Sequence, residues 1–163
     1  MKLLLTCGGT AGHVYPAVAL ARVFQRHYQD CQVLFVGADG GMELKLVAQE
    51  GYPIATVTIS NFRRSLSPKQ WGHNLKSAWN VVHSRRQAAG ILKDFSPDLV
   101  VGTGGYASFP AVRQAARMGI PTAIHESNAS PGLTTRTLAK YVDLVMVGFE
   151  EAVKSYEDPS KVK

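Results

Sequence analysis

The chain has 163 residues, of which 45% are hydrophobic and 18% charged, so it can bury one substantial core but is too short for two full α/β domains. Eighteen Lys and Arg against twelve Asp and Glu give a net charge of +6 at pH 7, which suits a partner that carries phosphates, a nucleic acid or an anionic membrane surface. The composition excludes a disordered chain and a coiled coil. No apolar run approaches the roughly 18 residues that a membrane-spanning helix needs.

Short apolar runs alternate with helix-length segments along the chain, and each run predicts a β-strand. The first run stops at Gly8-Gly9, too early for the apolar region of a secretion signal, so it is predicted to be a buried strand. Such alternation predicts a Rossmann-like, doubly wound α/β domain with a parallel sheet whose C-terminal edge binds the ligand. The predicted strands are residues 2–7, 32–37, 54–60, 99–102, 122–125 and 144–147.

Pro16 is expected near the start of the first helix, because proline suits a first-turn position. The helix after the fourth strand is expected to start near Phe109-Pro110. Cys7 and Cys31 lack the spacing of a zinc site or a disulfide framework and are predicted to be core thiols of a protein in a reducing cytoplasm. The domain is expected to span residues 1–156, with residues 157–163 beginning a linker.

Two glycine-rich turns follow the first and fourth predicted strands, and each leads into a helix. Free amides and the helix dipole at such a turn favour an anion. The pair therefore suggests two anionic groups or one diphosphate held by both turns, although tight turns without a ligand are the alternative. The first turn is neither GxGxxG nor a Walker A sequence, and its His13 could bind phosphate or act as a base. The turns are Gly8-Gly9-Thr10-Ala11-Gly12-His13 and Gly102-Thr103-Gly104-Gly105-Tyr106.

A third polar cluster, His125-Glu126-Ser127-Asn128, follows the fifth predicted strand and is expected at the same edge of the sheet. The alternative is that Asn128 and Ser130 only shape the turn and cap the next helix.

The net positive charge is concentrated in residues 51–93, which contain seven Lys or Arg and no Asp or Glu. Within this segment Trp71, Leu75, Trp79 and Val82 recur at helical spacing. This stripe either lies in the core or belongs to a basic surface at an anionic bilayer. The predicted membrane contacts are Phe62, Arg63, Arg64, Leu66 and Trp71.

The motifs at residues 8–17, 102–106 and 125–128, with Gly132-Leu133-Thr134, resemble the MurG family of bacterial glycosyltransferases. That family transfers N-acetylglucosamine (GlcNAc) from UDP-GlcNAc to lipid I in peptidoglycan synthesis. The resemblance covers essentially the whole chain, but only the N-terminal half of the family's GT-B architecture. It implies that the domain holding most of the nucleotide-sugar site lies outside these 163 residues and that this half alone is inactive.

The resemblance also implies roles for single residues. The diphosphate of lipid I, the acceptor, would lie between the turns, and the donor UDP-GlcNAc would touch the first turn and the third cluster. His13 is the first candidate for the base of this inverting reaction, with His125 or Glu126 as alternatives. The implied acceptor contacts are Gly9, His13, Gly104, Gly105 and Tyr106, and the implied donor contacts are Thr10, Ala11, Gly12 and Asn128.

Other properties implied by the resemblance concern partners and location. No metal, no cofactor and no nucleic acid is expected, and the protein would lie on the cytoplasmic face of the cell membrane as a peripheral protein. The sequence departs from the family's usual residues at Ala11 (usually Gly), Ser127 (Gln) and Thr135 (Asn).

Two other functions compete with a transferase. A non-catalytic membrane-docking subunit would bind the acceptor and act with a separate donor-binding chain. A nucleotide-dependent oxidoreductase is disfavoured, because only Asp39 ends the second strand and GxGxxG is missing.

Overall fold

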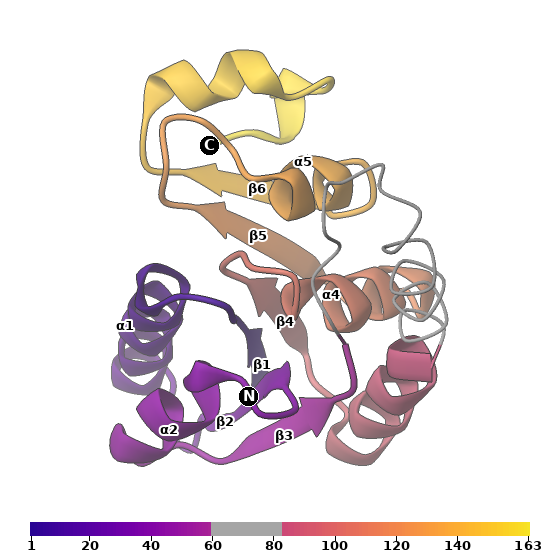
Figure 1. Ribbon diagram of the computed structural model, residues 1–163. Coiled ribbons are helices and arrows are strands. Elements are labelled where there is room, and N and C mark those ends of the chain that lie inside the picture. The colour runs from indigo at the N-terminus through magenta and orange to yellow at the C-terminus, as the bar shows by residue number, and fades with distance from the viewer. Residues whose placement is uncertain (60–82) are drawn as a thin grey trace.

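The computed structural model describes residues 1–59 and 83–163 (Figure 1). Within them lies a parallel sheet of six strands in the order β3-β2-β1-β4-β5-β6, which confirms the predicted Rossmann-like topology. All six strands lie where the apolar runs predict them, with ends that differ by no more than three residues. They are β1 Lys2–Thr6, β2 Gln32–Ala38, β3 Ile54–Val57, β4 Leu99–Gly102, β5 Thr122–Glu126 and β6 Leu144–Val147.

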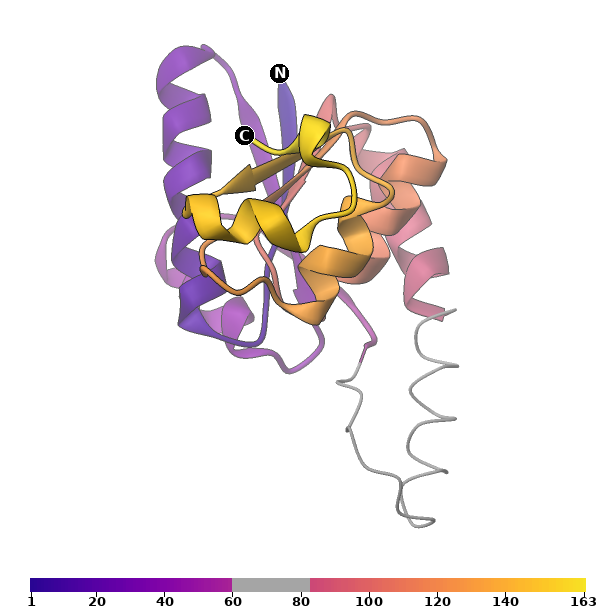
Figure 2. The same cartoon turned by 90° about the horizontal axis from the view of Figure 1, so that it is seen from above.

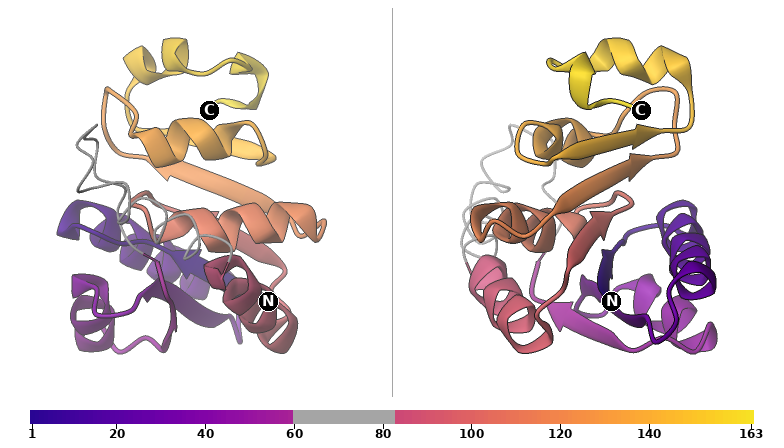
Figure 3. Two further views of the ribbon diagram at one scale, coloured as in Figure 1. Left: turned by 45° about the vertical axis from the view of Figure 1, so that its right-hand side comes forward. Right: turned by 180° about the vertical axis from the view of Figure 1, so that it is seen from behind.

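Helices cover both faces of the sheet (Figures 2 and 3). The helices α1 (Ala11–His27) and α2 (Met42–Gln49) pack on one face, where Leu3, Leu5 and Phe35 are completely buried. A helix that includes residues 83–95, α4 (Ser108–Arg117) and α5 (Leu133–Ala139) pack on the other face. The central strands of the sheet are therefore buried on both sides, as their continuous apolar runs require.

Helix α1 begins at Ala11, so the prediction that it starts near Pro16 is wrong. Thr10 is its extended N-cap residue, and its carbonyl accepts the first helical hydrogen bonds from the amides of His13 and Val14 at 3.1 and 3.4 Å. Pro16 lies in the second turn of the helix. Because proline has no N–H, only the carbonyl of Gly12 loses its helical hydrogen-bond donor, and Gly12 is an exposed residue. The second half of the first glycine-rich turn, from Ala11 to His13, consequently belongs to the first turn of the helix. Helix α4 starts at Ser108, next to the predicted position.

Cys7 and Cys31 are buried free thiols, which confirms the prediction that both belong to the core. Burial, together with the nearby charge of Glu43, raises the pKa of Cys7 to about 12, so its thiol stays protonated at neutral pH.

The C-terminal residues fold back along β6. After the 3₁₀ helices at Glu150–Ser155 and Pro159–Lys161, Val162 forms a parallel bridge with Val145. The Lys163 amide donates to the Val145 carbonyl and the Val147 amide to the Lys163 carbonyl, both at 2.9 Å. The predicted domain boundary at residue 156 stays a prediction.

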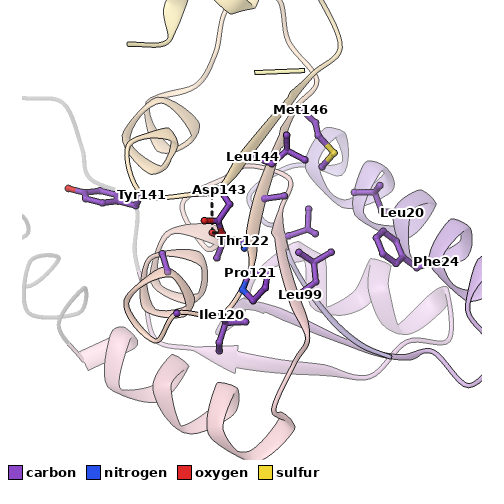
Figure 4. A pocket seen from close by; sticks show the side chains of 14 residues that line it. Leu20, Phe24, Leu99, Ile120, Pro121, Thr122, Tyr141, Asp143, Leu144 and Met146 are labelled. Carbon is purple, nitrogen blue, oxygen red and sulfur yellow. Dashed lines mark hydrogen bonds between the residues drawn. The ribbon is translucent and has the colours of Figure 1, made fainter. Parts of the chain in front are cut away.

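An apolar groove of about 470 Å³ lies on the α1 side of the sheet (Figure 4). Its walls include Leu20 and Phe24 of α1, Leu99 of β4, and Leu144 and Met146 of β6. In the part of the chain that the structure describes, no helix is both long and apolar enough to cross a bilayer.

Candidate functional site

Both glycine-rich turns reach one open pocket of about 270 Å³ at the C-terminal edge of the sheet. They follow β1 and β4, which are neighbours in the sheet, and the start of α5 forms a third wall. The prediction that the turns share one edge is thus confirmed. The pocket is lined by Gly8, Gly9, Thr10, His13, Gly105, Tyr106, Gly132, Leu133, Thr134 and Thr135.

The two turns touch each other, and the contact requires glycine. Gly105 has a φ of +78°, and a Cβ placed on it would overlap the carbonyl oxygen of Gly8. Gly104 has a φ of +106°, and a Cβ there would lie 2.6 Å from Nδ1 of His13. Side chains at either position would push the second turn away from the first.

Hydroxyl groups hold the second turn in this place. The Ser108 hydroxyl oxygen lies 2.7 Å from the Gly104 carbonyl and 3.0 Å from the Thr6 carbonyl at the end of β1. The Thr103 hydroxyl donates to the carbonyl of His13 at 2.6 Å. These hydrogen bonds tie the turn after β4 to both β1 and α1.

The N-terminus of α1 supplies unpaired donors beside the pocket. Thr10 makes no side-chain cap, and the first turn contains no acidic residue. Within residues 1–59 and 83–163, the amides of Ala11 and Gly12 have no hydrogen-bond acceptor. The Gly9 amide differs, because it donates to Oε2 of Glu43 at 3.2 Å. An anion at the helix terminus would therefore meet the amides that follow Gly9.

His13 and Tyr106 are the two large polar side chains of the pocket. Nδ1 of His13 is buried without a partner in the described chain. The ring of Tyr106 lies 3.5 Å from the position that a Cβ on Gly9 would occupy. Burial first, and then the charge of Glu43, raise the pKa of Tyr106, so its hydroxyl stays protonated and able to donate to an anion.

Glu126 organises the loop between β5 and α5. Its carboxylate, 2% exposed, accepts from the backbone amide and the side chain of Asn128 at 2.9 and 2.7 Å, and from the Gly132 amide at 3.0 Å. Burial acts to raise the pKa of Glu126, but these hydrogen bonds and one from Thr135 outweigh it, so the pKa lies below its ordinary value. Glu126 is therefore ionised at neutral pH and fully engaged in the loop.

His125 is half-buried, and successive residues of a strand face opposite sides of the sheet, so it faces away from the Glu126 side. Its Nδ1 is buried without a partner in the described residues. Burial lowers the pKa of His125, and the charge of Glu126 only partly opposes this. The imidazole is accordingly neutral at pH 7.

The pocket brings together only part of the predicted site. Gly9, Thr10, His13, Gly105 and Tyr106 line it. The other predicted residues surround this lining: Gly104 lies against the His13 ring, Ala11 and Gly12 continue the helix, and His125, Glu126 and Asn128 lie at the end of β5. The predicted membrane contacts Phe62, Arg63, Arg64, Leu66 and Trp71, together with the stripe that includes Trp79, lie outside the described residues.

Glu43 is the residue that sequence analysis missed. It is fully buried behind the first turn, and the only sequence signal is the row of glycines that precedes it, Gly37 and Gly40-Gly41. No group of three or more His, Cys, Asp or Glu in the described ranges is placed to hold a metal ion.

A parallel sheet of this order, with two glycine-rich turns meeting at its C-terminal edge, defines a Rossmann-like α/β domain, and the comparisons show that it is similar to the N-terminal domains of GT-B glycosyltransferases. The chain belongs to the glycosyltransferase family 28 N-terminal domain, which it matches over residues 3–147.

Its relatives include UDP-N-acetylglucosamine--N-acetylmuramyl-(pentapeptide) pyrophosphoryl-undecaprenol N-acetylglucosamine transferases. The protein from Lactococcus lactis subsp. lactis is 46% identical over 161 residues, and the one from Desulforamulus reducens is 42% identical over 162 residues. Both comparisons cover 99% of this chain but 44% and 42% of the relatives. The chain thus spans less than half the length of the curated relatives it matches.

Solved structures agree with this assignment. MurG from Acinetobacter baumannii matches with a TM-score of 0.80 and 29% identity, covering 99% of this chain and 44% of that one. A UDP-GlcNAc 2-epimerase from Neisseria meningitidis, bound to UDP-GlcNAc, has a TM-score of 0.70 at 16% identity over 99% of this chain and 45% of its own. The epimerase shares the fold alone.

Proposed function

We propose that this chain is the acceptor-binding domain of an inverting, UDP-GlcNAc-dependent hexosyltransferase that transfers GlcNAc to lipid I and forms lipid II. The observation that carries the proposal is the meeting of two glycine-rich turns, unpaired helix amides and His13 at one pocket. Relatives named for this reaction, 42–46% identical over nearly the whole chain, support it. They are more than twice as long, and we assign the donor-binding domain to the part that this chain does not span.

The pocket suits the diphosphate of lipid I. The amides of Ala11 and Gly12 at the N-terminus of α1 and the protonated hydroxyl of Tyr106 can donate to phosphate oxygens. Gly104 and Gly105 let the second turn approach the first closely enough for one diphosphate to span both. Because the amides of Ala11 and Gly12 are assigned to the acceptor diphosphate, UDP-GlcNAc would approach from the other side of the interdomain cleft and meet Thr10 and Asn128.

His13 is our first candidate for the base. As the 4-hydroxyl oxygen of the muramyl sugar forms a bond to C1 of GlcNAc, its proton passes to the imidazole, and the C1–O bond to UDP breaks with its electron pair leaving on UDP. Because Nδ1 is buried, Nε2 is the ring nitrogen that would accept this proton. His125 is neutral but lies outside the pocket lining, and Glu126 already accepts several hydrogen bonds. Both are weaker candidates.

The test is the transfer of radiolabelled GlcNAc from UDP-GlcNAc to a lipid I analogue, with the donor-binding domain of a relative added or left out. We expect transfer only when both domains are present. The variant His13→Asn should lower the rate about 10²–10⁴-fold. A matched change on the same helix, His27→Asn, should not, because His27 lies at the exposed far end of α1. Acceptor binding with no transfer under any condition would favour the non-catalytic docking subunit.

We further propose that the arginine-rich face beside the helix containing residues 83–95 rests on an anionic membrane surface, at the cytoplasmic side. Arg85, Arg86 and Arg117 line a recess of about 250 Å³ between this helix and α4. Burial, together with the charges of Arg117 and Arg113, lowers the pKa of Arg85. Neither of the two ion pairs found in the described residues involves these arginines, so their charge is free to attract an external anion.

Sedimentation with phosphatidylglycerol-containing and neutral vesicles tests this proposal. Arg86→Glu with Arg117→Glu should weaken binding to anionic vesicles about thirtyfold or more, since each basic residue near such a surface contributes roughly 1 kcal/mol. The control Arg26→Glu with Lys45→Glu makes the same charge change on the opposite face of the sheet. Equal losses from both pairs, or equal binding to neutral vesicles, would contradict the proposal.

A further inference from the structure

The buried acid Glu43 serves no group in the mechanism above. It is the second residue of α2, it is 0% exposed, and it takes part in neither ion pair found in the described ranges. Burying a carboxylate without a cation is costly unless its oxygens accept hydrogen bonds. The hydrogen bonds that it accepts therefore indicate its role.

Glu43 joins two loops at the edge of the sheet. Oε1 accepts from the Ala38 amide at the end of β2 at 2.8 Å, and Oε2 accepts from the Gly9 amide in the first glycine-rich turn at 3.2 Å. One side chain of α2 thus fixes the turn after β1 to the end of the neighbouring strand.

Three glycines make room for this carboxylate. A Cβ on Gly8 would lie 2.6 Å from Oε1 of Glu43, one on Gly37 would lie 2.6 Å from its Cγ, and one on Gly41 would overlap its carboxylate. Because the backbone closes tightly around it, the side chain has little freedom, and the position of Gly8 and Gly9 follows from it.

The position of Gly8 and Gly9 in turn sets the shape of the pocket. The Gly8 carbonyl touches Gly105 of the second turn, and the Tyr106 ring packs against Gly9. The charge of Glu43 also reaches the pocket, since it contributes to the raised pKa of Tyr106. Glu43 therefore acts on the pocket from behind, without lining it.

We propose that Glu43 is a positioning residue of the acceptor site: by holding the Gly9 amide it fixes the first turn against the second, so that a diphosphate meets the amides after Gly9 and not Gly9 itself. The inference rests on the proposed function, because it assigns the pocket to a diphosphate. A carboxylate behind Gly9 also repels phosphate from that end of the turn, which directs the anion toward the N-terminus of α1.

The first test needs no variant. The 163-residue chain, labelled with ¹⁵N, is titrated with a short-chain prenyl diphosphate while amide shifts and hydrogen exchange are followed. We expect the amides of Ala11, Gly12 and Gly105 to shift most, and the Gly9 amide to exchange more slowly than that of Ala11 before the ligand is added. A Gly9 amide that exchanges as fast as that of Ala11 in the free chain, or that shows the largest shift on titration, would overturn the inference.

The second test compares Glu43→Gln with Glu50→Gln, a matched change at the end of α2 where Glu50 pairs with Arg22 on the surface. Glutamine keeps one accepting oxygen and presents an NH₂ group to the other amide donor. Glu43→Gln should weaken prenyl diphosphate binding about tenfold and reduce the preference for diphosphate over monophosphate, whereas Glu50→Gln should change neither. A merely structural role would lower the melting temperature but leave that preference intact.

The outcomes separate the inference from the proposed function. Wild-type binding with an unchanged preference in folded Glu43→Gln would overturn the inference alone. No binding of prenyl diphosphate by the wild-type chain would overturn the proposed acceptor pocket and the inference with it. If Glu43→Gln does not fold, the wild-type exchange measurement still decides the inference.

Discussion

Replacing Glu126 with glutamine should destabilise the chain by an amount that the loop geometry sets. The carboxylate accepts two hydrogen bonds from Asn128 through one oxygen, and one from the Gly132 amide through the other. Glutamine matches the shape but has a single acceptor oxygen. If that oxygen stays on Asn128, the Gly132 amide faces an NH₂ group. Hydrogen bonds to a charged group contribute about 1.5–3 kcal/mol each, so we expect a loss of about 2–3 kcal/mol.

Urea unfolding followed by circular dichroism measures this loss. For a domain of this size it corresponds to a fall of roughly 4–12 °C in melting temperature. Glu157→Gln is the control, because the Glu157 side chain is 78% exposed in its pair with Lys140, and its removal should leave the unfolding midpoint nearly unchanged.

The difference in the free energy of unfolding between wild type and Glu126→Gln should depend on pH. The pKa of Glu126 in the folded chain lies below its ordinary value of 4.5, so the folded state favours the ionised form. Its contribution to stability is complete above pH 4.5 and is lost as the pH falls through the folded pKa. The free energies of unfolding of the two proteins should thus differ most at pH 7 and become similar in acid. Equal stability at pH 7, or a difference that grows in acid, would refute the assignment of Glu126 as the acceptor that organises this loop.

Three further predictions concern the pocket, the core and the donor. Gly105→Ala and its control Gly119→Ala both place alanine at a positive φ, +78° and +71°, with a strain of about 1–2 kcal/mol. The new Cβ would meet backbone atoms only at Gly105. A fluorescence titration should therefore show that Gly105→Ala abolishes prenyl diphosphate binding and that Gly119→Ala does not. With a pKa of about 12, Cys7 should react with a disulfide reagent at pH 8 at least about a hundredfold more slowly in the folded chain than in urea; equal rates would contradict its burial. Calorimetry should find only weak binding of UDP-GlcNAc by this chain alone, and micromolar affinity would contradict the proposal that the donor site lies in the part of the relatives that this chain does not span.

The sheet could be predicted from the sequence because a strand buried on both faces leaves a continuous apolar run. The start of α1 could not be placed, because Pro16 has the same preferred backbone angles in the second turn as in the first. Its tolerance in the second turn depends on the exposure of the Gly12 carbonyl, a fact of the folded structure.

Part of the candidate site could also be predicted, because its glycines leave a recognisable pattern in the sequence. Glycines after strands indicate turns that approach a ligand or a neighbouring chain segment, and both turns lie where the sequence puts them. Glu43 could not be found, since a glutamate in the first turn of a helix is normally exposed and favours the helix dipole. Its burial depends on the space left by Gly37 and by Gly8, and Gly8 lies far away in the sequence, after β1. Glu126 was found as part of a polar cluster, but its hydrogen bonds within the loop depend on the path of residues 127–132.

The most direct test of the central claim is the equilibrium binding of a soluble lipid I analogue to the 163-residue chain, measured by calorimetry with UDP-GlcNAc as competitor. We expect one analogue bound per chain, displacement by a prenyl diphosphate, and little displacement by UDP-GlcNAc. Absence of binding, or displacement by UDP-GlcNAc as effectively as by the prenyl diphosphate, would contradict the claim that the two glycine-rich turns form an acceptor site.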